Sequence, residues 1–196
     1  MDDNLDWKAH IGSIYTNIIK YTGIFYKLRG KIPANIMKNI YFATVHSKLL
    51  YGIELYANTY ISYLDNLMTL NNKILRIVQN KPYMSPRVSL YKDYFTLPID
   101  LLFKLKITQF VHQAYYNCHT LPDVFHSYFS TNSMLHAHDT RAKNLIHRHQ
   151  VNNSFGAKSL QFLGAKYWNT IPPTHRLIQD QQRFKNAVKE FLYCNL

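Results

Sequence analysis

The chain has 196 residues, of which 47% are hydrophobic and 17% are charged, and this composition predicts one large or two small globular domains rather than a disordered segment. Lys and Arg number 23 against 11 Asp and Glu, so the formal net charge of +12 favours a polyanionic partner such as nucleic acid. The two cysteines, Cys118 and Cys194, have no paired spacing, which argues against a disulfide scaffold or a zinc finger and suits a reducing compartment.

Three amphipathic helices are predicted at the start of the chain. The first begins after Asp6, a residue type that caps helices, and ends before Gly30. The second opens at Pro33, where the missing N–H costs nothing, and ends at Gly52, while the third spans residues 60–79. Because each helix can bury one apolar stripe on the others, short turns between them predict a compact bundle. The stripes are Ile11, Ile14, Tyr15, Ile18, Ile19 and Thr22 in the first helix, Ile36, Met37, Ile40, Tyr41, Val45 and Leu49 in the second, and Leu64, Leu67, Met68, Asn71, Leu75 and Val78 in the third.

Prolines break the helical pattern after this bundle. The segment 80–82 ends in a proline, and Ser85 before Pro86 forms a good cap and first position for a short helix that ends near Tyr94. A longer apolar and periodic helix follows over residues 99–118. We therefore place the main domain boundary within this break.

The last third of the chain gives a weaker pattern. Polar residues dominate residues 121–153, which predicts a loop-rich region with room for short strands. The segment 159–163 lies between two glycines and fits either a strand or a short helix, Pro172 and Pro173 end it, and a terminal helix spans residues 180–193. The predicted fold class is therefore mainly α. Its parts are a helical bundle over residues 1–80, a linker with helices over 81–120, and a carboxy-terminal region with a terminal helix over 121–196.

No constellation for catalysis or for a metal site is predicted. Asp2 and Asp3 form the only adjacent acidic pair, and acidic residues there suit the positive end of a helix dipole better than a catalytic site. A histidine-rich stretch could meet Zn²⁺ if it formed a short hairpin, but it has no nearby Cys and no His-Glu-x-x-His motif, so a polar loop surface is the preferred interpretation. The chain also lacks a Gly-x-Ser-x-Gly elbow and a phosphate-cradling glycine loop. The histidine-rich stretch contains His136, His138, Asp139, His147 and His149.

Basic residues are spread through the chain, and two groups of them are the candidate binding residues. Residues 1–30 carry four bases and three acids, residues 31–120 carry ten and four, and residues 121–196 carry nine and four. Five cations surround the first predicted helix–turn–helix, and two more lie three residues apart on the third helix, where they share a face. Such groups neutralise backbone phosphates without choosing a base sequence, although a solvated helix face is the alternative for any single lysine. The candidates are Lys20, Lys27, Arg29, Lys31 and Lys38 in the first group and Lys73 and Arg76 in the second.

Several short patterns, in the same order along the chain, resemble the region that follows the palm in jockey-type (LINE-class) non-LTR retrotransposon reverse transcriptases. Residues 2–11 are similar to the family's Asp-x-x-Leu-x-Trp-x-x-His-Ile start of the thumb, and residues 23–29 with Pro33 are similar to its turn between thumb helices. Residues 168–172 are similar to a Trp-Asn-x-Leu-Pro signature near the end of these proteins, with Ile171 in place of Leu. Further matching segments are 40–43, 49–53, 70–77, 139–141, 184–185 and 191–192.

The resemblance implies a thumb-like three-helix bundle and a second helical, loop-rich region of an RNA-directed DNA polymerase, without the fingers and the palm that carries the catalytic aspartates. We therefore expect the chain to bind RNA or an RNA–DNA duplex, with the missing palm and fingers as further partners, and to catalyse nothing alone. The Mg²⁺ of the reaction belongs to the missing palm, and no cofactor or metal is expected in this chain. A degenerate relic or a protein-interaction module without a nucleic-acid role is the alternative.

We expect the protein inside the cell, in the nucleus or the cytoplasm, and not at a membrane. Residues 1–6 are acidic and lack an apolar stretch, which is unlike a signal peptide. No window reaches the ~18 uninterrupted apolar residues of a membrane span. A membrane-surface role for basic amphipathic helices ranks last, because the apolar stripes are as broad as those of core helices.

Overall fold

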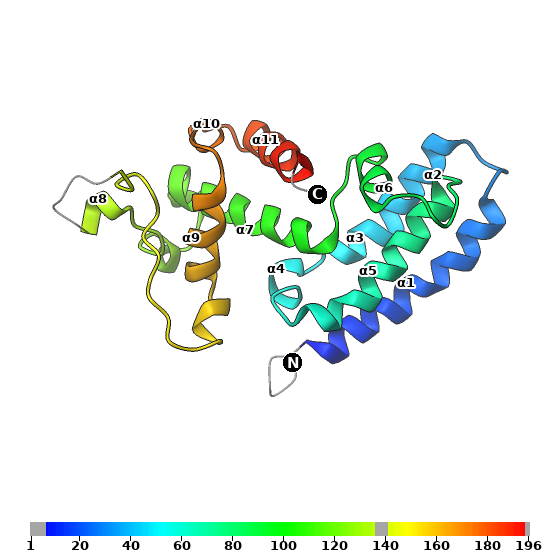
Figure 1. Cartoon of the computed structure of the whole chain (residues 1–196), viewed down its shortest axis with the longest axis horizontal. Helices are drawn as coiled ribbons and strands as arrows, with labels where there is room; N and C mark the ends of the chain where they lie inside the picture. The colour runs from blue at the N-terminus through cyan, green and yellow to red at the C-terminus, as the bar shows by residue number, and fades with distance from the viewer. Residues whose placement is uncertain (1–6, 136–140, 195–196) are drawn as a thin grey trace. The chain divides into compact units, whose positions relative to one another are not determined.

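The computed structural model describes residues 7–135 and 141–194, and it confirms the expected mainly α fold (Figure 1). Within those residues no β-strand forms, and the single extended pairing is an antiparallel bridge between Thr131 and Ile146. Helices joined by loops therefore position every candidate residue that the structure describes.

The chain divides into two compact units, Met1–Phe103 (unit 1) and Lys104–Leu196 (unit 2). The division falls inside helix α7 (Ile99–Tyr116), whereas the sequence pattern places boundaries after residues 80 and 120. The segment that follows the proline break belongs with unit 1, because helix α6 (Arg87–Asp93) packs against the last long helix of the bundle.

Helix α1 (Lys8–Leu28) buries one stripe and is followed by a left-handed glycine. The predicted stripe is wrong at Ile19, whose side chain is 42% exposed. Phe25 is fully buried instead, because it lies seven residues, or about two turns, after the buried Ile18. Gly30 has a φ of +73°, a conformation that glycine adopts without strain, and it lets the chain reverse toward the next helix.

The predicted second helix forms one helical run of three parts, namely α2 (Ala34–Tyr41), the π-helical turn η1 (Phe42–His46) and α3 (Ser47–Leu50). Its buried residues recur every four positions. In a regular α-helix such a repeat drifts by about 40° per step, and the wider π turn offsets part of this drift, so one stripe stays on the core. The predicted inner face is wrong at Ile36, which is 45% exposed. The four buried residues are Met37, Tyr41, Val45 and Leu49.

Helix α5 (Ile61–Val78) confirms the predicted third helix. It follows Gly52, whose φ is +65°, and the short helix α4 (Ile53–Tyr56). Helix α5 packs along α1 and also contacts α2 and α6, so it is the central helix of unit 1.

A buried polar network joins α5 to α2 and α6. The Tyr41 hydroxyl donates to Asn71 Oδ1 over 2.9 Å, and Asn71 Nδ2 donates to the Tyr91 oxygen over 3.2 Å. The Tyr91 hydroxyl in turn donates to Asn72 Oδ1 over 2.7 Å. Burial raises the pKa of Tyr91 to about 12, so this hydroxyl keeps its proton at neutral pH. The network therefore fixes the three helices to one another through neutral groups.

Unit 2 consists of helices separated by loops. The segment 159–163, which fits a strand or a helix by pattern, enters helix α9 (Leu160–Thr170), and the Ser159 side chain caps that helix. Helix α11 (Gln181–Cys194) confirms the predicted terminal helix. The other elements are the 3₁₀ turns η2 (Cys118–Thr120), η3 (Asp123–Phe125) and η4 (Gly156–Lys158) and the short helices α8 (Asn132–Leu135) and α10 (Pro173–Arg176).

Trp168 lies in the core of unit 2, and Asn169 beside it is half-buried. The Trp168 ring is 2% exposed, and its centre lies 5.5 Å from that of Phe184 and 6.3 Å from that of His112. Asn169 Nδ2 donates to the Ile146 carbonyl over 2.9 Å, and its Oδ1 accepts from the Ile146 N–H over 3.1 Å. Both residues of the pair therefore have packing roles in this chain.

Candidate nucleic-acid interface

The seven predicted binding residues all lie in unit 1. We call them the uncompensated cations, because no carboxylate pairs with them in the described part of the chain. Within residues 7–135 and 141–194, none of the seven forms an ion pair with a carboxylate. Ion pairs in unit 1 instead join Lys81 to Asp93 and Arg87 to Asp100. The structure thus separates cations that hold the fold from cations whose charge no carboxylate offsets. The uncompensated cations fall in three groups, on α1, at the turn between α1 and α2, and on α5.

Lys20 and Lys27 form the first group, on the outer face of α1. Each is exposed and lies two residues, or about 200° around the helix, after a buried residue, which is Ile18 for the first lysine and Phe25 for the second. Their seven-residue separation corresponds to about 10 Å along the helix axis, so both lysines lie on the same face of α1, two turns apart. This face therefore presents two cations in a row to solvent.

The second group surrounds the turn between α1 and α2. Arg29 Nε donates to Asn80 Oδ1 over 2.5 Å, and this bond ties the turn to the carboxy-terminal end of α5. Lys31, two residues later, is exposed. Lys38 lies on α2 with its Nζ 5.4 Å from the centre of the Tyr94 ring. The second group therefore has two cations in the turn and one on α2.

A cavity of about 380 Å³ lies beside this turn, and Met37 and Val78 are among its apolar lining residues. Lys81 and Asp93 also line the cavity, but they pair with each other, so their charges cancel. Arg29 is therefore the lining cation that is available to an anion.

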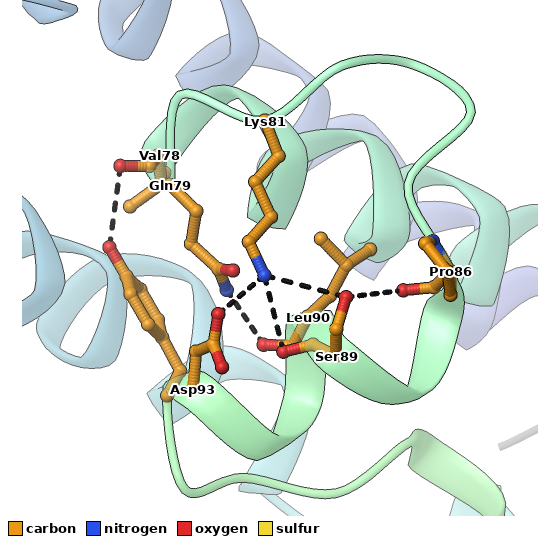
Figure 2. A network of polar contacts seen from close by, with 8 residues as sticks. Val78, Gln79, Lys81, Pro86, Ser89, Leu90 and Asp93 are labelled. Atoms are coloured by element: carbon orange, nitrogen blue, oxygen red, sulfur yellow. Dashed lines mark hydrogen bonds and ion pairs between the residues drawn. The ribbon is translucent and has the colours of Figure 1, made fainter.

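Lys81, a cation that the sequence analysis did not select, has a structural role, as Figure 2 shows. Its Nζ pairs with Asp93 and lies 3.4 Å from both the carbonyl oxygen and the hydroxyl of Ser89. Beside it, Gln79 Nε2 donates to the Leu90 carbonyl over 2.7 Å. These contacts fasten α6 to the end of α5.

Lys73 and Arg76, the third group, lie on α5 in different surroundings. Lys73 is exposed, whereas Arg76 is half-buried, and Arg76 Nη2 donates to the Ser85 carbonyl over 3.3 Å. The Arg76 guanidinium lies 5.7 Å from the centre of the Tyr83 ring, and its buried Nε has no hydrogen-bond partner in the part of the chain that the structure describes. Tyr83 is not among the predicted binding residues, although in the sequence it stands as an aromatic residue between Lys81-Pro82 and Pro86-Arg87.

Within the ranges described, no group of three or more His, Cys, Asp or Glu side chains is placed to hold a metal ion. His147 and His149 are described, with ring centres 5.1 Å apart, and His147 Nδ1 lies 3.2 Å from Asn132 Oδ1. The other candidates for an acidic cap, an acidic pair or a histidine site lie outside the described residues. They are Asp2, Asp3, Asp6, His136, His138 and Asp139.

Two further observations bear on the class of the protein. In the described parts of the chain, no helix is both long and apolar enough to span a bilayer. The chain matches none of the protein-family models, curated proteins and solved structures with which it was compared. A proposal for its function therefore depends on the cations and their geometry.

Proposed function

We propose that this chain binds RNA or an RNA–DNA duplex through the uncompensated cations of unit 1, as the thumb-like region of a non-LTR retrotransposon reverse transcriptase. On this proposal, the palm and fingers and the Mg²⁺ of the reaction lie outside this chain, and the chain catalyses nothing alone. Such a partner places the protein in the nucleus or the cytoplasm.

One observation carries the proposal: none of the seven cations has a carboxylate partner among the described residues, although Lys81 and Arg87 of the same unit do. Positive charge left without partners repels itself in the free protein. Phosphates relieve this repulsion and release the counterions condensed on the nucleic acid, which favours binding. The uncompensated cations therefore favour binding of a polyanion, while their mutual repulsion does not stabilise the fold.

The two arginines are already oriented for such contacts. Arg29 is held by Asn80, and Arg76 is held by the Ser85 carbonyl, so each loses less side-chain freedom on binding than a free arginine does. The planar guanidinium can still present its other N–H groups to a phosphate. The exposed lysines add charge without fixed geometry, and contacts of this kind position a nucleic acid without selecting its sequence.

The test compares two triple variants of the full chain. Removing Lys20, Lys27 and Lys73 as K20Q/K27Q/K73Q should make the slope of log K against log salt less steep by about 2 to 3, since each phosphate contact contributes roughly 0.7 to 0.9. Fluorescence anisotropy with a labelled RNA–DNA hybrid measures that slope. The matched control, R141Q/K166Q/R183Q, removes three exposed cations of unit 2 and should leave the slope nearly unchanged.

An equal change of slope in both variants would contradict the proposal, because it would show that net charge alone determines binding. Equal affinity of the chain for heparin and for nucleic acid would favour the degenerate relic instead.

A protein-interaction module is the second candidate, and exposed apolar residues of α1 favour it. Ile19 is 42% exposed and Tyr26 is 53% exposed, and their seven-residue spacing places them on one flank of the helix. On this alternative a partner protein covers this flank and the chain has no nucleic-acid role. The variant I19S/Y26S should then lose the partner, and the unmodified chain should bind no nucleic acid even in dilute buffer.

A further inference from the structure

The loop between α5 and α6 presents two large side chains to solvent. Tyr83 is 81% exposed and Met84 is 86% exposed. The Ser85 N–H donates to the Pro82 carbonyl over 3.1 Å, so the two residues sit at the tip of a closed turn. A ring that is this exposed has a face free to stack on another planar group.

The loop is anchored at both ends. On one side, the Lys81 N–H donates to the Arg76 carbonyl over 2.9 Å, and the Lys81 side chain is fastened to Ser89 and Asp93 on α6 (Figure 2). On the other side, Arg76 Nη2 donates to the Ser85 carbonyl. A ligand that stacks on the tip therefore meets a backbone with fixed ends, which lowers the entropic cost of binding.

Arg76 supports the exposed ring. Its guanidinium lies 5.7 Å from the centre of the Tyr83 ring, within the ~6 Å over which a cation and a ring attract each other. Arg76 covers only a small part of the Tyr83 side chain, because Tyr83 is still 81% exposed. Arginine and tyrosine side by side combine a phosphate-binding group with a stacking surface.

The charge around the loop identifies the class of ligand. Residues 66–92 contain five bases and no acid. Lys81 and Arg87 pair with the carboxylates of Asp93 and Asp100. Lys73 and Arg76 have no carboxylate partner among the described residues. An apolar peptide would make favourable contacts only with the exposed side chains of Tyr83 and Met84. A nucleic acid would also be attracted by the positive charge of Lys73 and Arg76.

We propose that Tyr83 stacks on an unpaired nucleobase of single-stranded nucleic acid, with Arg76 beside the ring and Lys73 near the phosphates of the same strand. The inference rests on the proposed function and narrows its ligand to nucleic acid that has unpaired nucleotides. Because every base has a π face, the contact tolerates any base sequence.

The experiment measures binding of the full chain to a labelled twelve-nucleotide oligouridine. Loss of one stacked base should weaken binding of Y83A by about 5- to 150-fold, with no change in the salt slope, because no phosphate contact is removed. Y83W should retain the affinity, and its added indole fluorescence should be quenched by the oligonucleotide. A blunt RNA–DNA duplex should bind Y83A and the unmodified chain equally.

The matched control is Y51A. Tyr51 is 79% exposed in the same unit, and in the described part of the chain no cation lies over its ring. If Y83A binds oligouridine as well as Y51A does, or if Y83W is not quenched, the stacking inference is overturned and the proposed function stands. If Y83A loses duplex binding equally, the contact is not with an unpaired base. If the unmodified chain binds neither nucleic acid in dilute buffer, the proposed function itself fails.

Discussion

The Asn169 side chain supplies both backbone hydrogen bonds of Ile146. Its amide bonds to both the N–H and the carbonyl of Ile146, the residue that forms a β-bridge with Thr131. Without this amide, the backbone N–H and the carbonyl of Ile146 would each need another hydrogen-bond partner. A buried polar group without a partner costs about 1 to 3 kcal/mol. The Trp-Asn pattern that contributes to the family resemblance is therefore explained here by packing and backbone hydrogen bonding.

His112 is the titratable residue at the centre of unit 2. It is fully buried, stacks on Phe184 with ring centres 4.2 Å apart, and its Nε2 donates to the Ile178 carbonyl over 2.7 Å. Its Nδ1 is buried and has no hydrogen-bond partner within the described ranges. Burial lowers the pKa of His112 below 6.5, although the bond to Ile178 and the charge of Asp180 partly raise it.

The lowered pKa predicts acid-sensitive stability of the chain. Below about pH 6.5 the unfolded histidine binds a proton that the folded one resists, so this contribution is complete above that pH and is lost as the pH falls below it. Thermal melts between pH 7.5 and 5 should show a larger fall in Tm for the unmodified chain than for H112Q, whose amide can still donate to Ile178. Parallel curves for the two proteins would refute the prediction.

At the scale of elements, two glycines inside helices have different surroundings. A Cβ on Gly164 of α9 would lie 2.7 Å from Phe129 Cε1 and 2.9 Å from Val111 Cγ2, so this glycine permits close packing. A Cβ on Gly23 of α1 would meet nothing within 4 Å. Among the described residues, Gly23 therefore permits no close contact, and glycine lowers the helix propensity at this position.

The pair predicts opposite effects on stability. G164A should lower the free energy of unfolding by about 1 to 3 kcal/mol, because the added methyl overpacks the core. G23A should raise it by up to about 1 kcal/mol, the difference in helix propensity between the two residues. Urea denaturation of both variants measures the effects, and a G164A variant as stable as G23A would show that the packing is looser than described.

At the scale of the whole chain, binding and catalysis are predicted to separate. Two-metal nucleotidyl transfer requires carboxylates that converge on the metal ions, and on the proposed function those carboxylates belong to the palm outside this chain. Primer extension on an RNA template with dNTPs and Mg²⁺ is then expected to give no product above background. Extension by the purified chain would contradict this expectation, and its loss in D2N/D3N would identify Asp2 and Asp3 as the catalytic pair.

The amino-acid sequence by itself determined where most helices lie. The spacing of apolar residues and the positions of Gly and Pro predicted α1, α5 and α11 within about two residues, because both signals act over one or two helical turns. The loop-rich stretch before α9 was also predictable from its polar composition. In α9 itself, a short apolar segment fitted both a strand and a helix, and local pattern could not distinguish them.

Only the tertiary structure decided which cations are engaged. Lys81 pairs with Asp93 at the end of α6, and Arg87 pairs with Asp100 in the first turn of α7, twelve and thirteen residues away. Lys73 has no carboxylate partner among the described residues. The tertiary structure also decided that Arg76 supports the Tyr83 ring and that Gly164 faces Phe129. These contacts depend on how elements pack and on the path of loops between them, and neither is encoded in the periodicity of a single segment.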